Sequence, residues 1–550
     1  MNLNTFLDDT AAKHPGRTAL VYPSGPDGGE SSLSYRELRR SVLRAAEAFR
    51  SKGIRRGDCV AIVHRNDPAF ILAYLGLARL AAVAVPINFM VKKAEELRFM
   101  LDHCGAKGVV TQREFLKGLL KARESLPGLK DVWVTDLKTK EEQNQETASP
   151  PRSEARPRGG RADTGDAGTG VASFWPFIES HEPFEGGAEI AGDTTASILY
   201  TSGTTGVPKG VMLTHANLTS NCDASIRAMA MSEKDVTITL LPMFHTFAWT
   251  ACVLIPLRLG AKNVITASVT PPKPWLKQMG RHKVTIFAAV PQLYAVLAKQ
   301  AAGLKGLILR YWFFRKVRIC VSGAAPLSPA TLQDFKRAFG RDIIEGYGLT
   351  ETSPVATINP PGRPKAGSVG LPIQDVSIRI VDDAGRELPG GAEGEILIKG
   401  PNVMKGYYDN EEATRQAVSP DGWLKTGDIG LIDEDGYLFI RDRKKDMIII
   451  KGLKVFSAQI EASLLSHPDI QEAAVIGVPD ASGDERIKAF VVLREGAQAG
   501  TSELHKFCRQ KFDPYKRPRD IEIMSELPKN ALQKILKRVL RQKELEKRKA

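Results

Sequence analysis

Residues 59–86 read CVAIVHRNDPAFILAYLGLARLAAVAVP and carry a strand–helix–strand pattern. Two short apolar runs, Cys59–Val63 and Ala82–Pro86, flank a segment with helical periodicity, Phe70–Leu80. Both runs are apolar at successive positions, which suits strands that are buried on two faces of a sheet. The same alternation continues from about Tyr35 to Gly430, so the sequence predicts an α/β fold in which helices cover mostly parallel sheets.

Outward from this stretch the pattern repeats and then changes. A helix is predicted at Ala94–His103, and further strands are predicted at Gly108–Thr111, Asp131–Thr135, Ser197–Tyr200, Val236–Leu241, Val284–Ala288, Val317–Val321 and Asp342–Ile344. From about Tyr437 two strands are followed by helices at Ala458–Leu465 and Ser502–Lys511, strands at Ala473–Val478, Ala489–Leu493 and Ile521–Met524, and a last helix from Ala531. This second pattern is typical of a small α+β domain.

The length of 550 residues is too great for one compact core, so two domains are expected. We predict a large N-terminal domain of helix-covered, mostly parallel sheets over residues 1–440 and a small α+β domain over residues 441–550. Residues 138–169 contain no apolar side chain larger than alanine other than proline, and they are rich in Pro, Gly, Arg and Glu. Such a segment cannot bury enough surface to offset its ordering, and we predict a flexible surface insertion.

Composition excludes several classes of protein. Hydrophobic residues make up 43% and charged residues 25%, which is ordinary for a globular chain and rules out a disordered or collagen-like one. Six scattered cysteines form no C-x-x-C pair or metal cluster, so a reducing compartment is expected. The N-terminus does not read as a signal peptide, and the apolar run Phe247–Pro256 is too short to span a bilayer. A cytoplasmic protein is predicted.

A Gly- and Thr-rich stretch is the strongest local signal for function. Residues 200–218 read YTSGTTGVPKGVMLTHANL, after a β-branched run that ends at Tyr200. Glycines let successive backbone N–H groups converge on an anion, while hydroxyls add donors and a lysine adds mobile charge. The candidate phosphate-binding residues are Thr201, Ser202, Gly203, Thr204, Thr205, Gly206 and Lys209. The alternative is a plain polar turn between a strand and a helix, and the density of hydroxyls with a lysine favours phosphate.

This stretch resembles the signature loop of the adenylate-forming superfamily, which includes acyl-CoA synthetases, luciferases and the adenylation domains of peptide synthetases. The resemblance extends in order from LSYRELRR (Leu33–Arg40) to LPKNALQKILKRVL (Leu527–Leu540). The segment GPNVMKGYYDNEEAT (Gly400–Thr414) is especially similar to the acyl-CoA synthetase branch. The resemblance implies an enzyme that uses ATP, Mg²⁺ and CoA to convert a carboxylic acid, through an acyl-adenylate, to an acyl-CoA.

Two further segments follow predicted strand ends, where ligands collect in α/β sheets. Gly323, Ala324 and Ala325 leave a flat slot for an adenine, and Tyr347, in the run Glu345-Gly346-Tyr347, can stack on it. The resemblance implies that Thr350 holds the α-phosphate or the carboxylate and that Glu351 coordinates Mg²⁺. An acid among phosphate-binding hydroxyls is a natural ligand for a hard cation. The alternative for Glu351 is an acid at a helix N-terminus that the dipole favours.

The C-terminal part contributes the remaining expected residues. The resemblance implies that Asp428 and Arg443 hold the ribose and that Lys445 is the hinge of a mobile small domain. By themselves, such alternating charges are usually a solvated face.

The resemblance also implies that Lys534 is the catalytic lysine, and that the loop containing Lys451, Gly452 and Leu453 lines the pantetheine tunnel. Three positions depart from the family pattern: Gln533 replaces a usual Gly, and Ser457 and Gln459 replace residues that are commonly Pro and Glu. Lys529 is a nearby competitor for the catalytic role.

His245 bears on the choice of acid substrate. It is interpreted as a wall of the carboxylate pocket, with a histidine beside a core strand as the alternative. No Asp stands between Leu240 and Arg258 to hold an α-ammonium group, which disfavours an amino acid. The apolar surroundings suit an acyl chain, so a fatty acid of medium or long chain is the first expectation and an aryl acid the second.

Other functions stay open at this point. A related ligase could load a carrier-protein thiol or stop at the acyl-adenylate. The net charge of +14 suggests anionic partners, but no nucleic-acid-binding motif is evident, and no nucleic-acid partner is expected. Peripheral membrane contact through the basic C-terminal region and the run Trp312–Lys316 is a further hypothesis, compatible with a lipid substrate.

Overall fold

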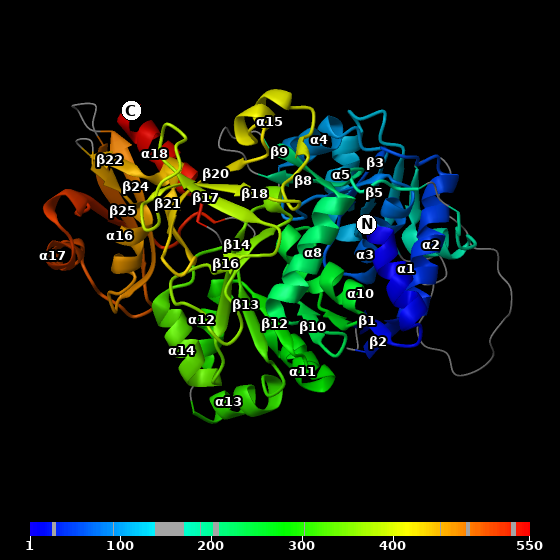
Figure 1. Cartoon of the computed structure of the whole chain (residues 1–550), viewed down its shortest axis with the longest axis horizontal. Helices are drawn as coiled ribbons and strands as arrows, with labels where there is room; N and C mark the ends of the chain where they lie inside the picture. Colours follow the sequence, from blue (N-terminus) through cyan, green and yellow to red (C-terminus); the bar gives the residue numbers. More distant parts are fainter. Residues whose placement is uncertain are drawn as a thin grey trace, which may run out of the picture.

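The computed structural model of the chain describes residues 1–24, 29–91, 93–137, 170–186, 189–201, 208–301, 303–450, 453–479, 485–529 and 535–549. Two large helix-covered sheets are followed by smaller sheets toward the C-terminus (Figure 1). The predicted insertion at 138–169 lies outside the described residues. Within the described ranges, no helix is long and apolar enough to cross a membrane.

The stretch at 59–86 folds as the sequence predicts, into two parallel strands joined by a helix. The sheet that contains it has eight strands in the described part of the chain, in the spatial order β19 (Gly406–Tyr407), β9 (Lys209–Thr214), β8 (Thr195–Thr201), β4 (Val83–Pro86), β3 (Cys59–Val63), β5 (Gly108–Thr111), β6 (Asp131–Val134) and β7 (Val171–Ser173). The strands from β8 to β7 are parallel, whereas β9 and β19 are added at one edge by antiparallel pairing. The helices of this region are α2 (Tyr35–Ser51), α3 (Pro68–Arg79), α4 (Ala94–His103), α5 (Arg113–Arg123) and α7 (Phe174–Glu179).

The second large sheet has nine described strands, in the spatial order β16 (Leu371–Pro372), β15 (Val355–Ile358), β14 (Ile343–Gly348), β13 (Ile319–Ser322), β12 (Ile286–Ala289), β10 (Val236–Thr239), β11 (Lys262–Ile265), β1 (Thr18–Ser24) and β2 (Gly29–Ser34). It is parallel from β14 to β1. Its longer helices are α8 (His215–Met229), α11 (Pro272–His282), α12 (Pro291–Gln300) and α14 (Pro329–Phe339). The carboxyl ends of its parallel strands β13 and β14 form the edge at which the predicted nucleotide residues Gly323–Ala325, Glu345–Tyr347 and Thr350 lie.

The chain then forms smaller antiparallel units. A four-stranded sheet contains β17 (Ser377–Val381), β18 (Gly394–Lys399), β20 (Leu424–Ile432) and β21 (Leu438–Arg443), with α15 (Glu411–Ala417) between β18 and β20 in the chain. The C-terminal elements are β22 (Ile448–Ile450), β23 (Leu453–Val455), α16 (Ser457–Leu464), β24 (Ile470–Pro479), β25 (Glu485–Leu493), α17 (Thr501–Lys511), β26 (Asp520–Ile523) and α18 (Lys537–Lys549). They enclose a separate apolar core that includes Ile460, Val475 and Leu504.

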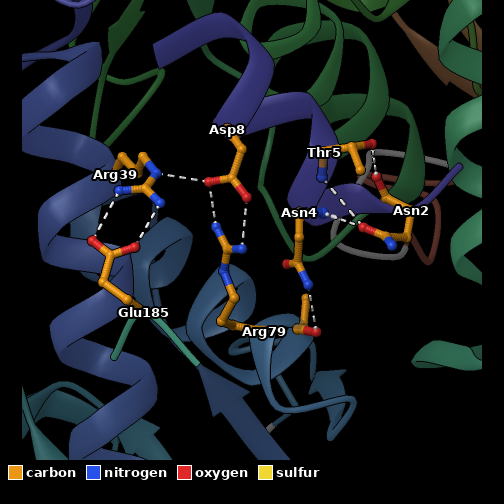
Figure 2. Close-up of polar contacts among 8 residues, drawn as sticks. Asn2, Asn4, Thr5, Asp8, Arg39, Arg79 and Glu185 are labelled. Atoms are coloured by element: carbon orange, nitrogen blue, oxygen red, sulfur yellow. Dashed lines mark hydrogen bonds and ion pairs between the residues drawn. The ribbon is translucent and has the colours of Figure 1, made fainter. Parts of the chain in front are cut away.

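The N-terminal helix α1 (Leu3–Lys13) is fixed to the first large sheet by paired charges (Figure 2). Asp8 on α1 accepts hydrogen bonds from Arg39 Nε of α2 at 2.8 Å and from Arg79 Nη2 of α3 at 2.6 Å. Arg39 also donates to both carboxylate oxygens of Glu185. The adjacent arginines lower the pKa of Asp8 despite its partial burial, so this carboxyl is held in its charged form.

The α/β class with a smaller C-terminal α+β part is confirmed, and most predicted elements agree with the structure within a few residues. The strands Cys59–Val63 and Gly108–Thr111 and the helix Ala94–His103 have the predicted bounds. The prediction for the last helix was wrong at its start, because α18 begins at Lys537 and not at Ala531. The predicted domain limit at 440–441 falls inside β21, which stays paired with β20 as far as Arg443.

Candidate active site

A tight turn at the end of β14 positions two of the predicted catalytic residues. The chain turns through η3 (Thr350–Thr352) and returns as β15, antiparallel to β14. A Cβ atom at Gly348 would lie 1.7 Å from the carbonyl oxygen of Pro354, so only glycine fits there. This close approach holds Thr350 and Glu351 at the carboxyl edge of the second large sheet.

Tyr347, Asp428 and Arg443, all predicted nucleotide-binding residues, are brought together by two different sheets. The Tyr347 hydroxyl donates a hydrogen bond of 2.7 Å to Asp428 Oδ2, and Arg443 Nε lies 3.0 Å from Asp428 Oδ1. Asp428 and Arg443 are opposite each other in the antiparallel β20–β21 pair, so strand register places their charges side by side. Burial raises the pKa of Tyr347, and the phenol therefore stays protonated as a donor.

Glu345 lies on β14 before Tyr347, and the pKa of its carboxyl is raised. Burial raises the pKa of its carboxyl to about 7, against a smaller lowering by a backbone hydrogen bond from Leu327. Near neutral pH the group is therefore present in both its acid and its carboxylate form. A carboxyl group in this state can donate as well as accept a hydrogen bond.

The segment Gly323-Ala324-Ala325 follows β13 and lies against the predicted wall of the acid pocket. A Cβ atom at Gly323 would lie 3.4 Å from the ring of Phe247, so that ring faces the Gly323 backbone. Ala324 has a φ of 68°, in the left-handed region that residues with a side chain rarely adopt, and its side chain is exposed. His245 Nδ1 accepts a hydrogen bond of 3.3 Å from the Phe247 backbone N–H, which fixes the ring at the start of α9 (Thr246–Ala248).

Two buried hydroxyls beside these segments have no hydrogen-bond partner among the described residues. They are Ser322 Oγ, at the end of β13, and Thr246 Oγ1, next to His245. Because an unpaired buried hydroxyl is costly, a polar group of a bound ligand is a suitable partner for each. Sequence reasoning missed both, since a Ser at a strand end and a Thr in an apolar run carry no signal of their own.

The predicted phosphate loop connects two antiparallel strands. It leaves β8 at Thr201 and returns at Lys209 on β9, and these two residues are opposite each other in the β8–β9 pair. The alternative of a turn leading from a strand into a helix was wrong, because β9 intervenes before α8. The predicted residues Ser202, Gly203, Thr204, Thr205 and Gly206 lie outside the described residues.

Tyr407 links the predicted metal ligand Glu351 to the predicted phosphate-binding Lys209. Its hydroxyl donates a hydrogen bond of 3.0 Å to Glu351 Oε1, and Lys209 Nζ lies 4.9 Å from the centroid of its ring. Pairing of β19 with β9 places Tyr407 beside Lys209. The Met404 N–H, three residues before Tyr407, donates a hydrogen bond to the Glu351 carbonyl and joins the same two segments. Tyr407 lies in the segment Gly400–Thr414 that is similar to acyl-CoA synthetases, but the sequence gives this residue no role because its partners are distant in the chain.

The surroundings of Glu351 fit a bound Mg²⁺. Burial raises the pKa of the Glu351 carboxyl, so a nearby cation would favour its charged form. The described residues contain no cluster of three or more potential metal ligands, and Glu351 is the carboxylate that the family resemblance assigns to the metal. Mg²⁺ is commonly held in this way, by one or two carboxylates together with substrate phosphates and water.

The predicted hinge Lys445 lies exposed in η4 (Lys444–Asp446), between β21 and β22. Partial desolvation of its amino group and the nearby Arg443 charge lower its pKa, although the side chain as a whole is exposed. Its neighbour Asp446 forms a 2.8 Å ion pair with Arg541 of α18, so the segment is tied to the C-terminal helix. Leu453, predicted to line the CoA path, is 51% exposed at the start of β23. Lys451 and Gly452 lie outside the described residues.

The departure at Ser457 has a structural role. Ser457 is fully buried, and its hydroxyl donates a hydrogen bond of 2.7 Å to Asp442 Oδ2 and accepts one of 2.8 Å from Lys537 Nζ. Lys537 also forms a 2.7 Å ion pair with Glu461 Oε1, which accepts the Val475 N–H. Serine thus joins the strand before the predicted hinge to α16 and α18, a contact that proline could not make.

The two candidate catalytic lysines are distinguished in part by the structure. Lys529 Nζ forms a 2.5 Å ion pair with Glu472 Oε1 of β24, inside the C-terminal elements. This contact gives Lys529 a structural partner away from the nucleotide residues described above. Lys534 and the preceding Gln533 lie outside the described residues, and the role of Lys534 stays a prediction.

The chain matches a known protein family and is similar to relatives over nearly its whole length. A family model described as "AMP-binding enzyme" matches residues 7–408, and one described as "AMP-binding enzyme C-terminal domain" matches residues 459–534. A long-chain-fatty-acid–CoA ligase of Bacillus subtilis is 32% identical, with 99% of this chain and 95% of that protein aligned. A crotonobetaine/carnitine–CoA ligase of Salmonella agona is 33% identical, with 98% and 99% aligned.

Solved structures are similar to this chain over nearly its whole length. The anthranilate–CoA ligase AuaEII in complex with anthranoyl-AMP has a TM-score of 0.85 and 28% identity, covering 99% of this chain and 97% of that one. ATP-bound MatB from Rhodopseudomonas palustris also has a TM-score of 0.85 and 28% identity, with 99% of each chain covered. The similarity therefore includes both the large N-terminal sheets and the small C-terminal unit.

Proposed function

The chain belongs to the family of AMP-binding enzymes, and on that premise we propose that it is an acyl-CoA synthetase whose acid substrate is a long-chain fatty acid. The reaction is a ligation that uses ATP, Mg²⁺ and CoA and releases AMP and pyrophosphate. Two observations together carry the proposal. The chain aligns over nearly its full length with CoA ligases. Five candidate residues also converge at one edge of the sheets, namely Tyr347, Asp428, Arg443, Glu351 and Lys209.

The first half-reaction makes the acid reactive. A carboxylate oxygen attacks the α-phosphorus of ATP, the bond from that phosphorus to the bridging oxygen breaks, and pyrophosphate leaves. Two anions approach each other in this step, so positive charge at Lys209 and hydrogen-bond donors at Thr350 and the loop 202–206 lower its barrier. Mg²⁺ held by Glu351 would neutralise charge on the phosphate oxygens. Lys534 is proposed to contribute a further positive charge.

The nucleoside is held by the residues that meet at Asp428. The carboxylate of Asp428, oriented by Arg443 and the Tyr347 hydroxyl, accepts hydrogen bonds from a ribose diol. Gly323, Ala324 and Ala325 are proposed to form the flat side of the adenine slot, and Tyr347, which lies on the neighbouring strand β14, to stack on the adenine. The partly protonated Glu345 lies beside them and can donate to a nucleotide acceptor.

The second half-reaction transfers the acyl group to sulfur. The thiol of CoA attacks the acyl carbon, a C–S bond forms, and AMP leaves with the C–O electron pair. We propose that the C-terminal domain, residues 441–550, turns about Lys445 between the two steps. This motion withdraws Lys534 and brings Lys451, Gly452 and Leu453 to the path of the pantetheine arm. Domain closures of this kind often limit turnover.

The acid pocket is proposed to be the apolar region in which His245 and Phe247 lie against Gly323. A fatty acid is supported by the relatives named long-chain-fatty-acid–CoA ligase, and an aryl acid is the second candidate because the anthranilate ligase is a structural neighbour. The six cysteines are free and buried, which supports work in a reducing compartment such as the cytoplasm.

Pyrophosphate release is the direct test. Purified protein with ATP and Mg²⁺ is offered short-, medium- and long-chain fatty acids and aromatic acids, with and without CoA. We expect acid-dependent pyrophosphate release that is fastest with long-chain acids, and acyl-CoA formed only when CoA is present. Acyl-AMP that accumulates despite added CoA would overturn CoA as the acceptor, and a preference for aromatic acids would overturn the fatty acid.

A further inference from the structure

One continuous stretch of 98 residues in the N-terminal part carries positive charge without any acid. Between Val236 and Gln333 the sequence has no Asp or Glu, whereas it has twelve basic residues: Arg258, Lys262, Lys273, Lys277, Arg281, Lys283, Lys299, Lys305, Arg310, Arg315, Lys316 and Arg318. The net charge of the whole chain is +14, so this span accounts for most of it. A charge imbalance of this size attracts anionic partners.

The fold gathers part of this span at one end of the molecule. After α12 the chain forms α13 (Gly303–Ile308) and η2 (Leu309–Phe313), which lead into β13 (Figure 1). In Figure 1 this segment lies at the lower end of the view, away from the C-terminal elements. We call the surface formed by α13, η2, the residues 314–316 that follow η2, and the adjoining side of α11 the basic tip.

Large apolar side chains project from the basic tip. Trp312 is 70% exposed, Tyr311 is 61% exposed, and Leu307 and Ile308 are about half exposed, at 53% and 48%. The segment is nevertheless fixed to the core, because Phe314, directly after η2, is 1% exposed within the apolar cluster. Four exposed apolar side chains within six residues mark an interaction surface.

Trp312 also shows which side of α11 belongs to the basic tip. A Cβ atom at Gly280 would lie 3.2 Å from the Trp312 indole, so the ring covers that glycine. Lys273 and Lys277 precede Gly280 by seven and three positions, a spacing that places all three on one face of the helix. Both lysines are exposed.

The basic side chains of the tip are not neutralised by neighbours. Lys273, Lys277, Arg315 and Lys316 form no ion pair with any other residue in the described ranges. Arg310 lies over the ring of Tyr311 at 5.3 Å, which puts a cation beside an exposed aromatic. Inward from the tip the pattern differs, since Arg281 and His282 pair with Glu30, and Arg318 pairs with Asp235.

We propose that the basic tip is a docking surface for an anionic lipid bilayer. Unpaired Lys and Arg side chains bind the negative headgroups, while Trp312, Tyr311 and the two aliphatic side chains enter the interface between headgroups and acyl chains. A second copy of this chain is a poorer occupant, because two basic tips repel each other. Nucleic acid would use the charge and the aromatics but would leave Leu307 and Ile308 against a polar surface.

Docking in this way leaves the candidate active site accessible. The basic tip precedes β13, and the nucleotide residue Gly323 follows that strand, so the two lie at its opposite ends. A four-residue strand separates them by about 13 Å along its axis. The inference goes beyond the proposed function, since the ligase reaction does not require it.

Vesicle flotation tests the proposal directly. The full chain is mixed with vesicles of phosphatidylcholine alone or of phosphatidylcholine with phosphatidylglycerol, at low and high salt. We expect binding to the anionic vesicles only, weakened by salt. The double variant Arg315→Glu/Lys316→Glu should lower the partition coefficient by about tenfold or more. The matched control Lys117→Glu/Lys121→Glu reverses two exposed charges on α5 and should bind as the wild type does.

Tryptophan fluorescence gives a second, site-specific readout. Among the six tryptophans Trp312 is the exposed one, because Trp133, Trp249, Trp275 and Trp423 are buried and Trp175 is partly buried. Brominated lipid in the anionic vesicles should therefore quench the wild type, whereas Trp312→Phe should lose this quenching and still float. Equal quenching of both proteins would overturn the insertion of Trp312.

Several outcomes would overturn lipid docking as a whole. The first is equal binding to neutral and anionic vesicles, and the second is unchanged binding of the Arg315→Glu/Lys316→Glu variant. The third is a wild type that binds no vesicles and is a dimer in light scattering, while that variant is a monomer. The last result would identify a second copy as the occupant. Retention of an oligonucleotide in place of vesicles would identify nucleic acid. Pyrophosphate release with a soluble acid, measured on every variant, confirms that each one is folded.

Discussion

The hydroxyl of Tyr407 donates a hydrogen bond of 3.0 Å to Oε1 of Glu351, across fifty-six positions of sequence. The contact joins β19, at the edge of the first large sheet, to the turn that ends β14 in the second. The proposed metal ligand therefore depends on the junction between the two sheets, and so does the position of Lys209 over the Tyr407 ring.

Tyr407→Phe should weaken use of Mg²⁺ and ATP. A hydrogen bond to a carboxylate is lost, and the KM for Mg²⁺-ATP should rise by roughly tenfold. The Tyr407 hydroxyl lowers the pKa of Glu351 against the larger effect of burial, so its removal raises that pKa further. The acid limb of the pH–rate profile should then move to higher pH. Tyr408→Phe changes the next residue, and a similar loss in that control would remove the specific role of Tyr407.

Glu345 should make stability depend on pH. Its pKa in the folded chain is about 7, above the ordinary value for a glutamate, so the folded state binds the proton more tightly than the unfolded state does. The contribution of Glu345 is therefore fully present at acid pH and is lost as pH rises through about 7. The Tm of the wild type minus that of Glu345→Gln should fall by a few degrees over this range, and a flat difference would contradict the assignment.

Lys537 should stabilise the C-terminal unit through Glu461 and Ser457. Lys537→Met leaves the Glu461 carboxyl, whose pKa burial already raises, without its cation. Loss of one partner from a buried ion pair costs about 3 kcal/mol, which urea unfolding followed in the C-terminal unit would detect. Lys543→Met removes an exposed lysine from the same helix and should be nearly neutral. Equal effects of the two variants would count against the network.

Lys534 and Lys529 should differ in which step they affect. Lys534→Ala is expected to abolish adenylate formation from acid and ATP while sparing transfer from supplied acyl-AMP to CoA. Lys529→Ala breaks the ion pair with Glu472 and should lower the Tm with little change in the rate of adenylation. Adenylation lost in Lys529→Ala and retained in Lys534→Ala would reverse the two assignments.

The sequence predicted the fold where local pattern determines it. The strand Cys59–Val63 is buried on both faces, and its run of apolar residues therefore identified a central parallel strand. The antiparallel strand β9 was missed because Lys209 and Gly210 read as a continuation of the polar loop. The start of the last helix was predicted too early in the sequence, because Ala531-Leu532-Gln533-Lys534 has helical propensity. In the structure, Ile535 instead forms an isolated β-bridge with Lys529.

Candidate site residues could be named from sequence where a motif contains them, but not where contacts between distant segments create a possible role. The family resemblance predicted that Asp428 and Arg443 together hold the ribose, and the β20–β21 register explains why they meet. Tyr407, Ser322 and Thr246 were missed because their significance arises from Glu351 and from unpaired burial. Ser457 stood out as a departure from the family pattern, but its bonds to Asp442 and Lys537 could not be read from sequence.

The nucleotide products of the complete reaction show whether the chain forms an acyl-CoA through an acyl-adenylate. The purified chain is supplied with ATP, Mg²⁺, CoA and a long-chain fatty acid, and AMP, pyrophosphate and acyl-CoA are quantified together. We expect the three products to appear in equal amounts and none to form when the acid is omitted. ADP and inorganic phosphate in place of AMP and pyrophosphate would contradict it, as would nucleotide cleavage that does not depend on the acid.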